Sequence, residues 1–369
     1  MSRLRRVIEM AGPGWFTSVM GTGILGVDLV ASPIADRHMD IVGAVVWGVA
    51  AIVLAVIVVL LALRAAVAPA GLAATLRDPA VAQLWGAPPM AAFTVAVGLM
   101  RIAAPHGGGE LAIGLAQVLF VAGAFGGLFT AFYVPYLMMT KMEIDSDHAL
   151  ATWLLPVVPP VVAAVPAALL LPTFPAALQS SILASAYAML GLGVALAALI
   201  VAVFFSRLLF AKLPTGSLAP SMWIVIGPLG QSIAAASALG AAAVVVWPAF
   251  GRGLETAALA YGVLVWGFGM YWLALALVTT LRAARAGMPF TLGWWSFTFP
   301  VGVLTAGTDA LYAQTGAALF GISSVALLIL LAAAWALVAT KTSRSAIHAL
   351  VAPPAAASET SPGVAAPAR

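Results

Sequence analysis

The segment GPGWFTSVMGTGILG, residues 12–26, carries side chains that could interact with an ion inside a membrane span. Ser18 and Thr22 lie one helical turn apart, so their hydroxyl groups share a face if the segment is a helix. Gly21 and Gly23 permit close approach to a neighbouring helix. The early proline is typical of a helix start, where free N–H groups attract anions. We therefore expect these four residues to line a path through the protein.

Three charged residues fall inside apolar runs, near the same end of each run: Asp28, Arg101 and Asp309. Charges at such depth usually pair with one another or mark a pathway. One hypothesis is an Asp28–Arg101 ion pair in an outer vestibule; the alternative is that all three reach the headgroup region separately. His106 and His148 occupy predicted loops. Either could bind a metal or carry a proton, although isolated loop histidines usually do neither.

The composition of the chain defines its class. Of 369 residues, 63% are hydrophobic and 8% charged, with a mean hydropathy of +1.11. Soluble domains carry about 25% charged residues, so this chain is predicted to be an all-α, multi-span membrane protein. It has no cysteine, which excludes disulfides, thiolate metal sites and a cysteine nucleophile. The basic residues lie mainly between apolar runs, which indicates membrane orientation rather than nucleic-acid binding.

Apolar runs of about 20 residues are needed to cross a bilayer. RLRR at residues 3–6 followed by an apolar run could be a removed signal, but the glycines and proline of 12–14 favour a retained first span. We predict ten spans, at 14–31, 41–63, 88–104, 111–138, 150–171, 179–205, 221–247, 256–281, 290–310 and 316–340.

The distribution of basic residues orients these spans. With both termini in the cytoplasm, only Arg37, Arg101 and Arg252 of the 16 lysines and arginines lie outside. Positive charge is retained on the cytoplasmic side, so this asymmetry supports ten spans in the plasma membrane. We divide the chain into a cytoplasmic N-terminus, 1–12, a ten-span domain, 13–340, and a disordered cytoplasmic tail, 341–369.

Proline and small polar residues concentrate in the odd-numbered spans, whereas the even-numbered spans are uniformly aliphatic. A carbonyl freed by proline finds no partner in lipid, so such kinks belong inside the protein. We predict five helical hairpins in a ring, with odd helices around a pore and even helices facing lipid. The alternative is that these residues only aid helix packing. Further predicted lining residues are Pro159, Pro160, Gly227, Pro228, Gln231 and Ser232.

Four motifs carry a family resemblance: GPGWFTSVMGTGI, TWLLPVVPPVVAA, SMWIVIGPLGQS and WWSFTFP, beginning at residues 12, 152, 221 and 294. Together they resemble the tellurite-resistance/dicarboxylate transporter family, which includes TehA proteins, yeast malate and sulfite transporters and plant slow anion channels. The resemblance covers about residues 10–340. It implies a ring of five hairpins around a pore, transport of small anions and assembly as a homotrimer.

The same resemblance implies a gate in the ninth span. The family's blocking phenylalanine aligns with Phe299, directly before Pro300, and its preceding tyrosine position holds Phe297 here. An aromatic side chain beside a proline on an inner helix could swing in and out of a pore. Without the resemblance, a core aromatic between helices would be an equal interpretation.

The leading function is transport of small anions, namely C4-dicarboxylates such as malate, or sulfite and other inorganic anions, through a Phe-gated pore. A proton-coupled dicarboxylate carrier is the alternative. A membrane enzyme is the rival class, but no HExxH, phosphate-loop or GxSxG motif is present. A sensor is a third class, and the short tail holds no evident regulatory domain. We expect no cofactor, no metal and no nucleic-acid partner.

Overall fold

The protein is almost wholly helical in the residues that the computed structural model describes, 3–141 and 149–351, and these ranges contain no strand. This confirms the predicted all-α class. The α-helices are α1 (Arg3–Met10), α2 (Phe16–Ala31), α3 (Arg37–Val67), α4 (Pro69–Arg77), α5 (Pro79–Ala82), α6 (Ala87–Gly98), α7 (Gly109–Lys141), α8 (Pro159–Leu170), α9 (Ala176–Ala211), α10 (Ile226–Val246), α11 (Gly251–Arg285), α12 (Phe299–Thr315) and α13 (Ala318–Val351).

Seven helical stretches of the described chain are long and apolar enough to cross a membrane, so the chain is a multi-pass membrane protein. One stretch, Gln83–Lys141, contains both α6 and α7, which a π-helical segment, Leu99–Gly108, connects. Its backbone leaves the helical region at His106 and Gly107, where φ reaches 100° at the glycine. Two shorter helices coincide with further predicted spans: the apolar α8, and α12 with 17 residues.

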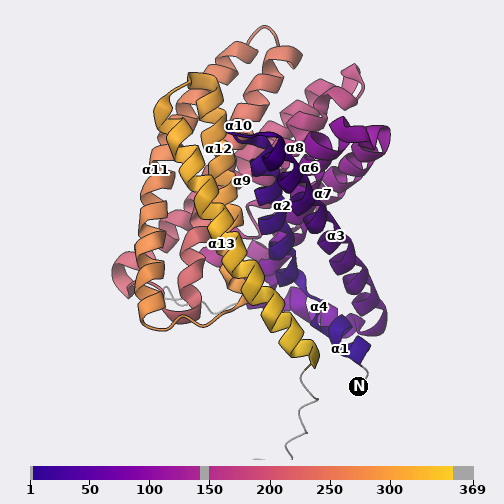
Figure 1. Cartoon of the computed structure of the whole chain (residues 1–369), viewed down its shortest axis with the longest axis vertical. Coiled ribbons are helices and arrows are strands. Elements are labelled where there is room, and N and C mark those ends of the chain that lie inside the picture. The colour runs from indigo at the N-terminus through magenta and orange to yellow at the C-terminus, as the bar shows by residue number, and fades with distance from the viewer. Residues whose placement is uncertain (1–2, 142–148, 352–369) are drawn as a thin grey trace, which may run out of the picture.

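Five helices contact one another in a closed cycle, in the order α2, α6, α8, α10, α12 and back to α2. Each of these inner helices also packs against the long helix that follows it: α3, α7, α9, α11 or α13 (Figure 1). The long helices carry most of the large exposed apolar side chains. Examples, one from each long helix, are Ile52, Phe132, Leu199, Leu264 and Ile329.

Most prolines of the inner helices lie at helix starts, which corrects the predicted mid-span kinks. Pro89, Pro160, Pro228 and Pro300 all occupy the first turn of their helix. The first four N–H groups of a helix have no partner within it, so proline costs no hydrogen bond there. Pro166 of α8 is the exception among these helices, because it lies in the helix interior.

A 3₁₀ segment with a tryptophan precedes each inner helix in the chain. The segments are Pro13–Trp15, Gln83–Gly86, Ala151–Leu154, Gly216–Val225 and Leu292–Phe297. Three of the indoles donate a hydrogen bond to a threonine near the end of another helix. The pairs are Trp85 with Thr75 at 3.1 Å, Trp223 with Thr280 at 2.8 Å and Trp295 with Thr342 at 3.1 Å. These bonds anchor helix starts to α4, α11 and α13.

The first helix, α1, and the last turns of α13 lie at the same end of the molecule (Figure 1). At that end, Arg64 of α3 donates a hydrogen bond to the carbonyl of Ala11. The predicted domain limit at residue 340 falls within α13, which continues to Val351. Residues 352–369 of the predicted tail lie outside the described residues.

Glycine allows two inner helices to approach closely. A Cβ atom on Gly230 of α10 would lie 2.4 Å from the backbone nitrogen of Leu304 in α12. Backbone atoms cannot move aside as a flexible side chain can, so a larger residue would force the two helices apart. The closed cycle of inner helices therefore depends on this contact.

We expect Gly230→Ala to lower the midpoint of thermal unfolding in detergent by several degrees, because overpacking costs about 1–3 kcal/mol. Gly191→Ala on α9 is the matched control, since a Cβ there meets no atom within 4 Å. It should leave the midpoint unchanged or raise it slightly. Equal midpoints for the two variants would contradict the close α10–α12 contact.

Candidate functional site

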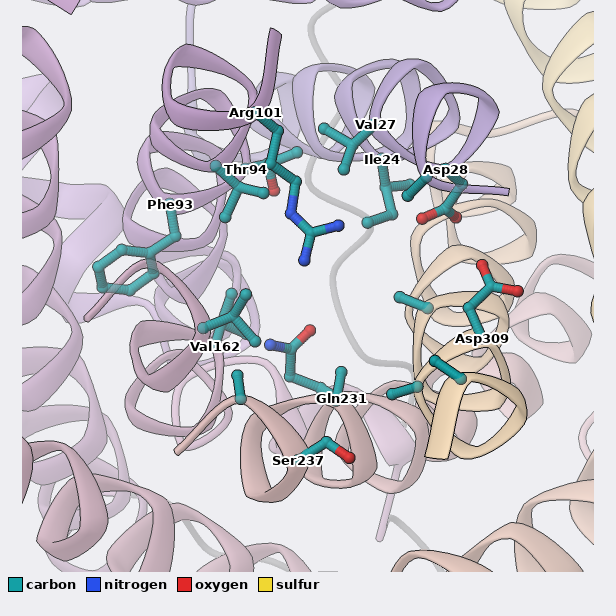
Figure 2. A pocket seen from close by; sticks show the side chains of 18 of the residues that line it. Ile24, Val27, Asp28, Phe93, Thr94, Arg101, Val162, Gln231, Ser237 and Asp309 are labelled. Carbon is teal, nitrogen blue, oxygen red and sulfur yellow. The ribbon is translucent and has the colours of Figure 1, made fainter. Parts of the chain in front are cut away.

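Two cavities lie between the inner helices. The wide cavity, of about 380 Å³, lies toward the C-terminal ends of these helices and is shown in Figure 2. The narrow cavity, of about 180 Å³, lies among the helix starts and the 3₁₀ segments. All five inner helices contribute side chains to the wide cavity, and Figure 2 shows several of them around it.

Phe299 is the residue that lines both cavities. It is the first residue of α12, and its side chain is buried. Thr298 before it donates its hydroxyl hydrogen to the Trp295 carbonyl at 2.7 Å, and Pro300 after it lines the narrow cavity. The short 3₁₀ segment and the start of α12 thus place the aromatic ring where the two cavities meet.

Phe297, predicted to belong to the gate, lines neither cavity. Its ring packs on Trp223 and Trp294, with ring centroids 5.2 and 5.7 Å apart. It therefore connects the start of α12 to the 3₁₀ segment before α10. This residue is a packing support, two positions from the side chain at the cavity junction.

The lining face of α2 differs from the prediction. Ser18 and Thr22 line neither cavity, because each hydroxyl is engaged elsewhere. Ser18 donates to the Trp15 carbonyl at 2.7 Å, and Thr22 accepts from the Trp335 indole of α13 at 3.0 Å. The α2 residues that do line the cavities are Thr17 and Met20 for the narrow one, and Ile24, Val27, Asp28 and Ala31 for the wide one.

Gly21 and Gly23 also serve helix packing and line neither cavity. A Cβ on Gly21 would meet the Thr298 hydroxyl at 2.1 Å, and one on Gly23 would meet the Thr94 methyl at 2.7 Å. The predicted lining role of these glycines is therefore corrected to close contact with α6 and with the start of α12. The residue Thr94 itself lines the wide cavity.

The other predicted lining residues divide into two groups. Gly227 and Pro228 line the narrow cavity, and Gln231 lines the wide one. Pro159 and Pro160 are buried away from both cavities. Val158, the N-cap residue of α8, lines the narrow cavity, and Val162 and Val165 of α8 line the wide one. The Ser232 hydroxyl also lies away from them, accepting a hydrogen bond from Tyr261 at 2.8 Å.

The wide cavity brings together the three predicted charges, Asp28, Arg101 and Asp309, and adds Glu255 of α11 (Figure 2 labels the first three). Arg101 is exposed, and its guanidinium points into the cavity. In the described part of the chain no ion pair joins Arg101 to Asp28 or Asp309, so the hypothesised Asp28–Arg101 pair is not formed. Glu255 was not identified from the sequence because this residue lies in a predicted loop, directly before the predicted span 256–281.

Polar groups without a protein partner face the same cavity. Gln231 is 5% exposed, and no hydrogen bond joins its amide to another described residue. Both carboxylate oxygens of Asp28 are buried without a partner. A buried polar group without a partner is costly, so these side chains indicate a site that another species occupies.

Of the two histidine candidates, only His106 lies within the described residues. His106 lies in the π-helical segment, with Nδ1 2.8 Å from the Ile102 carbonyl oxygen. His148 lies outside the described residues. No group of three or more possible metal ligands occurs within 3–141 and 149–351.

The fold and the cavities define a helical membrane protein with two chambers separated at one aromatic residue. Residues 11–343 match the voltage-dependent anion channel family, and the chain belongs to that family. The suspected relationship is thereby confirmed, and the chain is a membrane protein of an anion-transporting family.

Similar proteins include two sulfite efflux pumps named SSU1, from Arthroderma otae and Trichophyton rubrum. Each is 30% identical over 334 residues, covering 88% of this chain and 88% of the relative. An uncharacterized transporter of Methanocaldococcus jannaschii is 26% identical over 303 residues, covering 81% and 84%. These relatives are transporters, in agreement with a non-enzymatic function.

The revised lining face can be tested because the chain has no cysteine of its own. We expect Thr17→Cys to react with a small, charged thiol reagent about tenfold faster than Ser18→Cys, because thiol reactivity requires exposure. The rates are measured in detergent by mass spectrometry. Faster modification of Ser18→Cys would restore the face expected from sequence.

Proposed function

We propose that the protein carries small anions, with sulfite as the leading substrate, along a path that joins the narrow and wide cavities, and that Phe299 gates this path. The observation that carries the proposal is that Phe299 lines both cavities. A side chain at such a junction blocks passage in one rotamer and opens it in another. The identity of two relatives as sulfite efflux pumps supports the choice of substrate.

We further propose that the five inner helices and the five long helices cross the membrane as five hairpins, with α2, α6, α8, α10 and α12 around the path. Their closed cycle of contacts supports this arrangement, as do the exposed apolar side chains of the outer helices. The proposed location is the plasma membrane, with both termini in the cytoplasm and the wide cavity facing outward. The homotrimer implied by the family resemblance is retained as part of the proposal.

The lining of the wide cavity favours a compact oxyanion. Arg101 is its one cation among the described residues, and Gln231 adds an unpartnered amide. A guanidinium can bind an oxyanion with two parallel hydrogen bonds. A C4-dicarboxylate carries two carboxylates, and a second cation to match the second carboxylate does not line this cavity.

A proton-coupled dicarboxylate carrier is the second candidate function. The observation in its favour is the pair of acidic side chains, Asp28 and Asp309, beside the path (Figure 2). Flux into proteoliposomes of sulfite, malate, chloride and nitrate, with and without a proton gradient, separates the two functions. A malate flux that requires the proton gradient would favour the carrier.

We expect Phe299→Ala to raise sulfite flux in proteoliposomes about tenfold, which corresponds to a barrier lowered by about 1.4 kcal/mol. Phe297→Ala is the matched control: it removes an equally large buried ring that lines neither cavity, so flux per folded protein should change little. Unchanged flux in Phe299→Ala, at equal incorporation, would refute the gate.

We expect Arg101→Gln to lower flux on the order of tenfold, because it removes the positive charge beside the path. Arg252→Gln is its control, since Arg252 is also an exposed arginine but lines neither cavity. The initial rate of sulfite uptake is measured for both variants at several ionic strengths. Equal rates would show that Arg101 does not act on the transported anion.

A further inference from the structure

The wide cavity contains more acidic than basic side chains, which is unexpected on a path for anions. Asp28, Asp309 and Glu255 line it together with Arg101. If all four were charged, the cavity would carry a net negative charge and would repel the proposed substrate. The arrangement of the two aspartates indicates how this negative charge is reduced.

Asp28 is fully buried, with 0% of its surface exposed, although it lines the cavity. Neither carboxylate oxygen has a hydrogen-bond partner. Helix α12 packs closely over it: a Cβ added to Gly302 would lie 3.1 Å from Asp28 Oδ2 and 2.5 Å from a side-chain carbon of Ile24. The carboxyl group is therefore enclosed between α2 and α12.

Asp309 presents its carboxyl group to the same place. Figure 2 shows the carboxyl groups of Asp28 and Asp309 directed toward one another from α2 and α12. Ser324 of α13 donates a hydrogen bond to Asp309 Oδ1, which fixes the orientation of the side chain. Its Oδ2 atom is buried and has no partner. The two aspartates thus have three buried oxygens that need a donor.

A single proton supplies part of what these oxygens lack, because it binds to one of them and is donated to a second. A carboxylate accepts hydrogen bonds but cannot donate one, whereas a protonated carboxyl group has an O–H donor. Two carboxylates in one site cannot both be charged at low cost, and a shared proton removes one charge. We propose that Asp28 and Asp309 form a proton-binding site, and that its occupancy controls the passage of anions. This inference rests on the proposed anion-transport function.

Other charged groups lie on the elements around this site. Arg101 faces it from the π-helical segment and Glu255 faces the cavity from α11 (Figure 2 shows Arg101). Near this end of α3, which packs on α2, Arg37, His38 and Asp40 are all exposed to the surroundings. Helix α13 carries two described basic side chains, Lys341 and Arg344. Both lie toward its C-terminal end, several turns away from Ser324.

The direction of the pH effect follows from the charges. When the site holds its proton, Arg101 faces less negative charge and an anion can enter the wide cavity. When the proton leaves, negative charge increases opposite Arg101 and repels the anion. Flux should therefore rise as the pH falls on the wide-cavity side of Phe299, and should respond less to pH on the narrow-cavity side.

The decisive experiment measures nitrate flux in proteoliposomes, because nitrate keeps its charge over the tested pH range. Lowering the pH on the wide-cavity side from about 8 to about 5 should raise wild-type flux on the order of tenfold. Asp28→Asn and Asp309→Asn should each hold flux near the low-pH level and flatten its pH dependence. Glu255→Gln is the control: it should raise flux at every pH but keep the pH dependence.

A second measurement is independent of transport. Infrared difference spectra of the wild-type protein between the same two pH values should show a protonated carboxyl band, which Asp309→Asn removes. Folding of each variant is checked by size-exclusion chromatography. Absence of the band in the wild type, or wild-type pH dependence in both aspartate variants, would overturn the proposal. A flux that responds to replacement of Na⁺ by a bulky organic cation, and not to pH, would overturn it as well.

The outcomes also separate this inference from the proposed function. If the wild-type protein moves no anion at any pH, the transport proposal fails, and the infrared band still decides whether the aspartates bind a proton. If anions move but with the same rate at both pH values, transport stands and the proton-binding site is refuted.

Discussion

The starts of the five inner helices lie within the protein, and the rest of the structure depends on how their first backbone groups are accommodated. The first N–H groups of a helix have no partner within that helix, and lipid offers none. Proline in the first turn removes one such donor, and the preceding 3₁₀ segments use shorter-range hydrogen bonds. The same helix starts surround the narrow cavity, with lining residues that include Thr17, Met90, Val158, Pro228 and Pro300. The positive ends of the helix dipoles are thereby placed beside the narrow cavity.

Close packing of the inner helices then determines the electrostatics of the wide cavity. Because Gly302 lets α12 approach α2, the carboxyl group of Asp28 is enclosed rather than hydrated. Arg101 is on the π-helical segment, where the wider turn changes the direction of side chains relative to an α-helix. Such segments occur frequently at functional sites. One charge is therefore buried beside the path while the opposite charge is directed into it, and the two are not neutralised by a direct ion pair.

Much of the fold could be predicted from hydropathy and proline placement, but side-chain directions could not. The apolar runs indicated helices because the bilayer requires long apolar segments, and each run coincides with a helix of the structure. The aromatic residue at Phe299 was identified through the family resemblance. Ser18 and Thr22 were assigned to the wrong face, because a 3.6-residue period shows which residues share a face but not where that face points. The loop predicted around His106 lies where the backbone leaves the helical region, within the segment Leu99–Gly108.

The five inner helices are alike at their starts, and the one that differs, α12, carries Phe299. At each of the other four helices, one residue lines the narrow cavity, and a second residue three or four positions later lines the wide cavity. On α12 the same residue, Phe299, lines both cavities. Its ring therefore lies at the level where, on the other helices, the lining changes from one cavity to the other. The residues on either side of that level are mostly apolar, and an apolar constriction excludes ions by excluding water. The proposed closure therefore requires no charged group at Phe299, and in this proposal the charges of the wide cavity act on the anion separately. The pairs that bracket this level are Met20 and Ile24, Met90 and Phe93, Val158 and Val162, and Pro228 and Gln231.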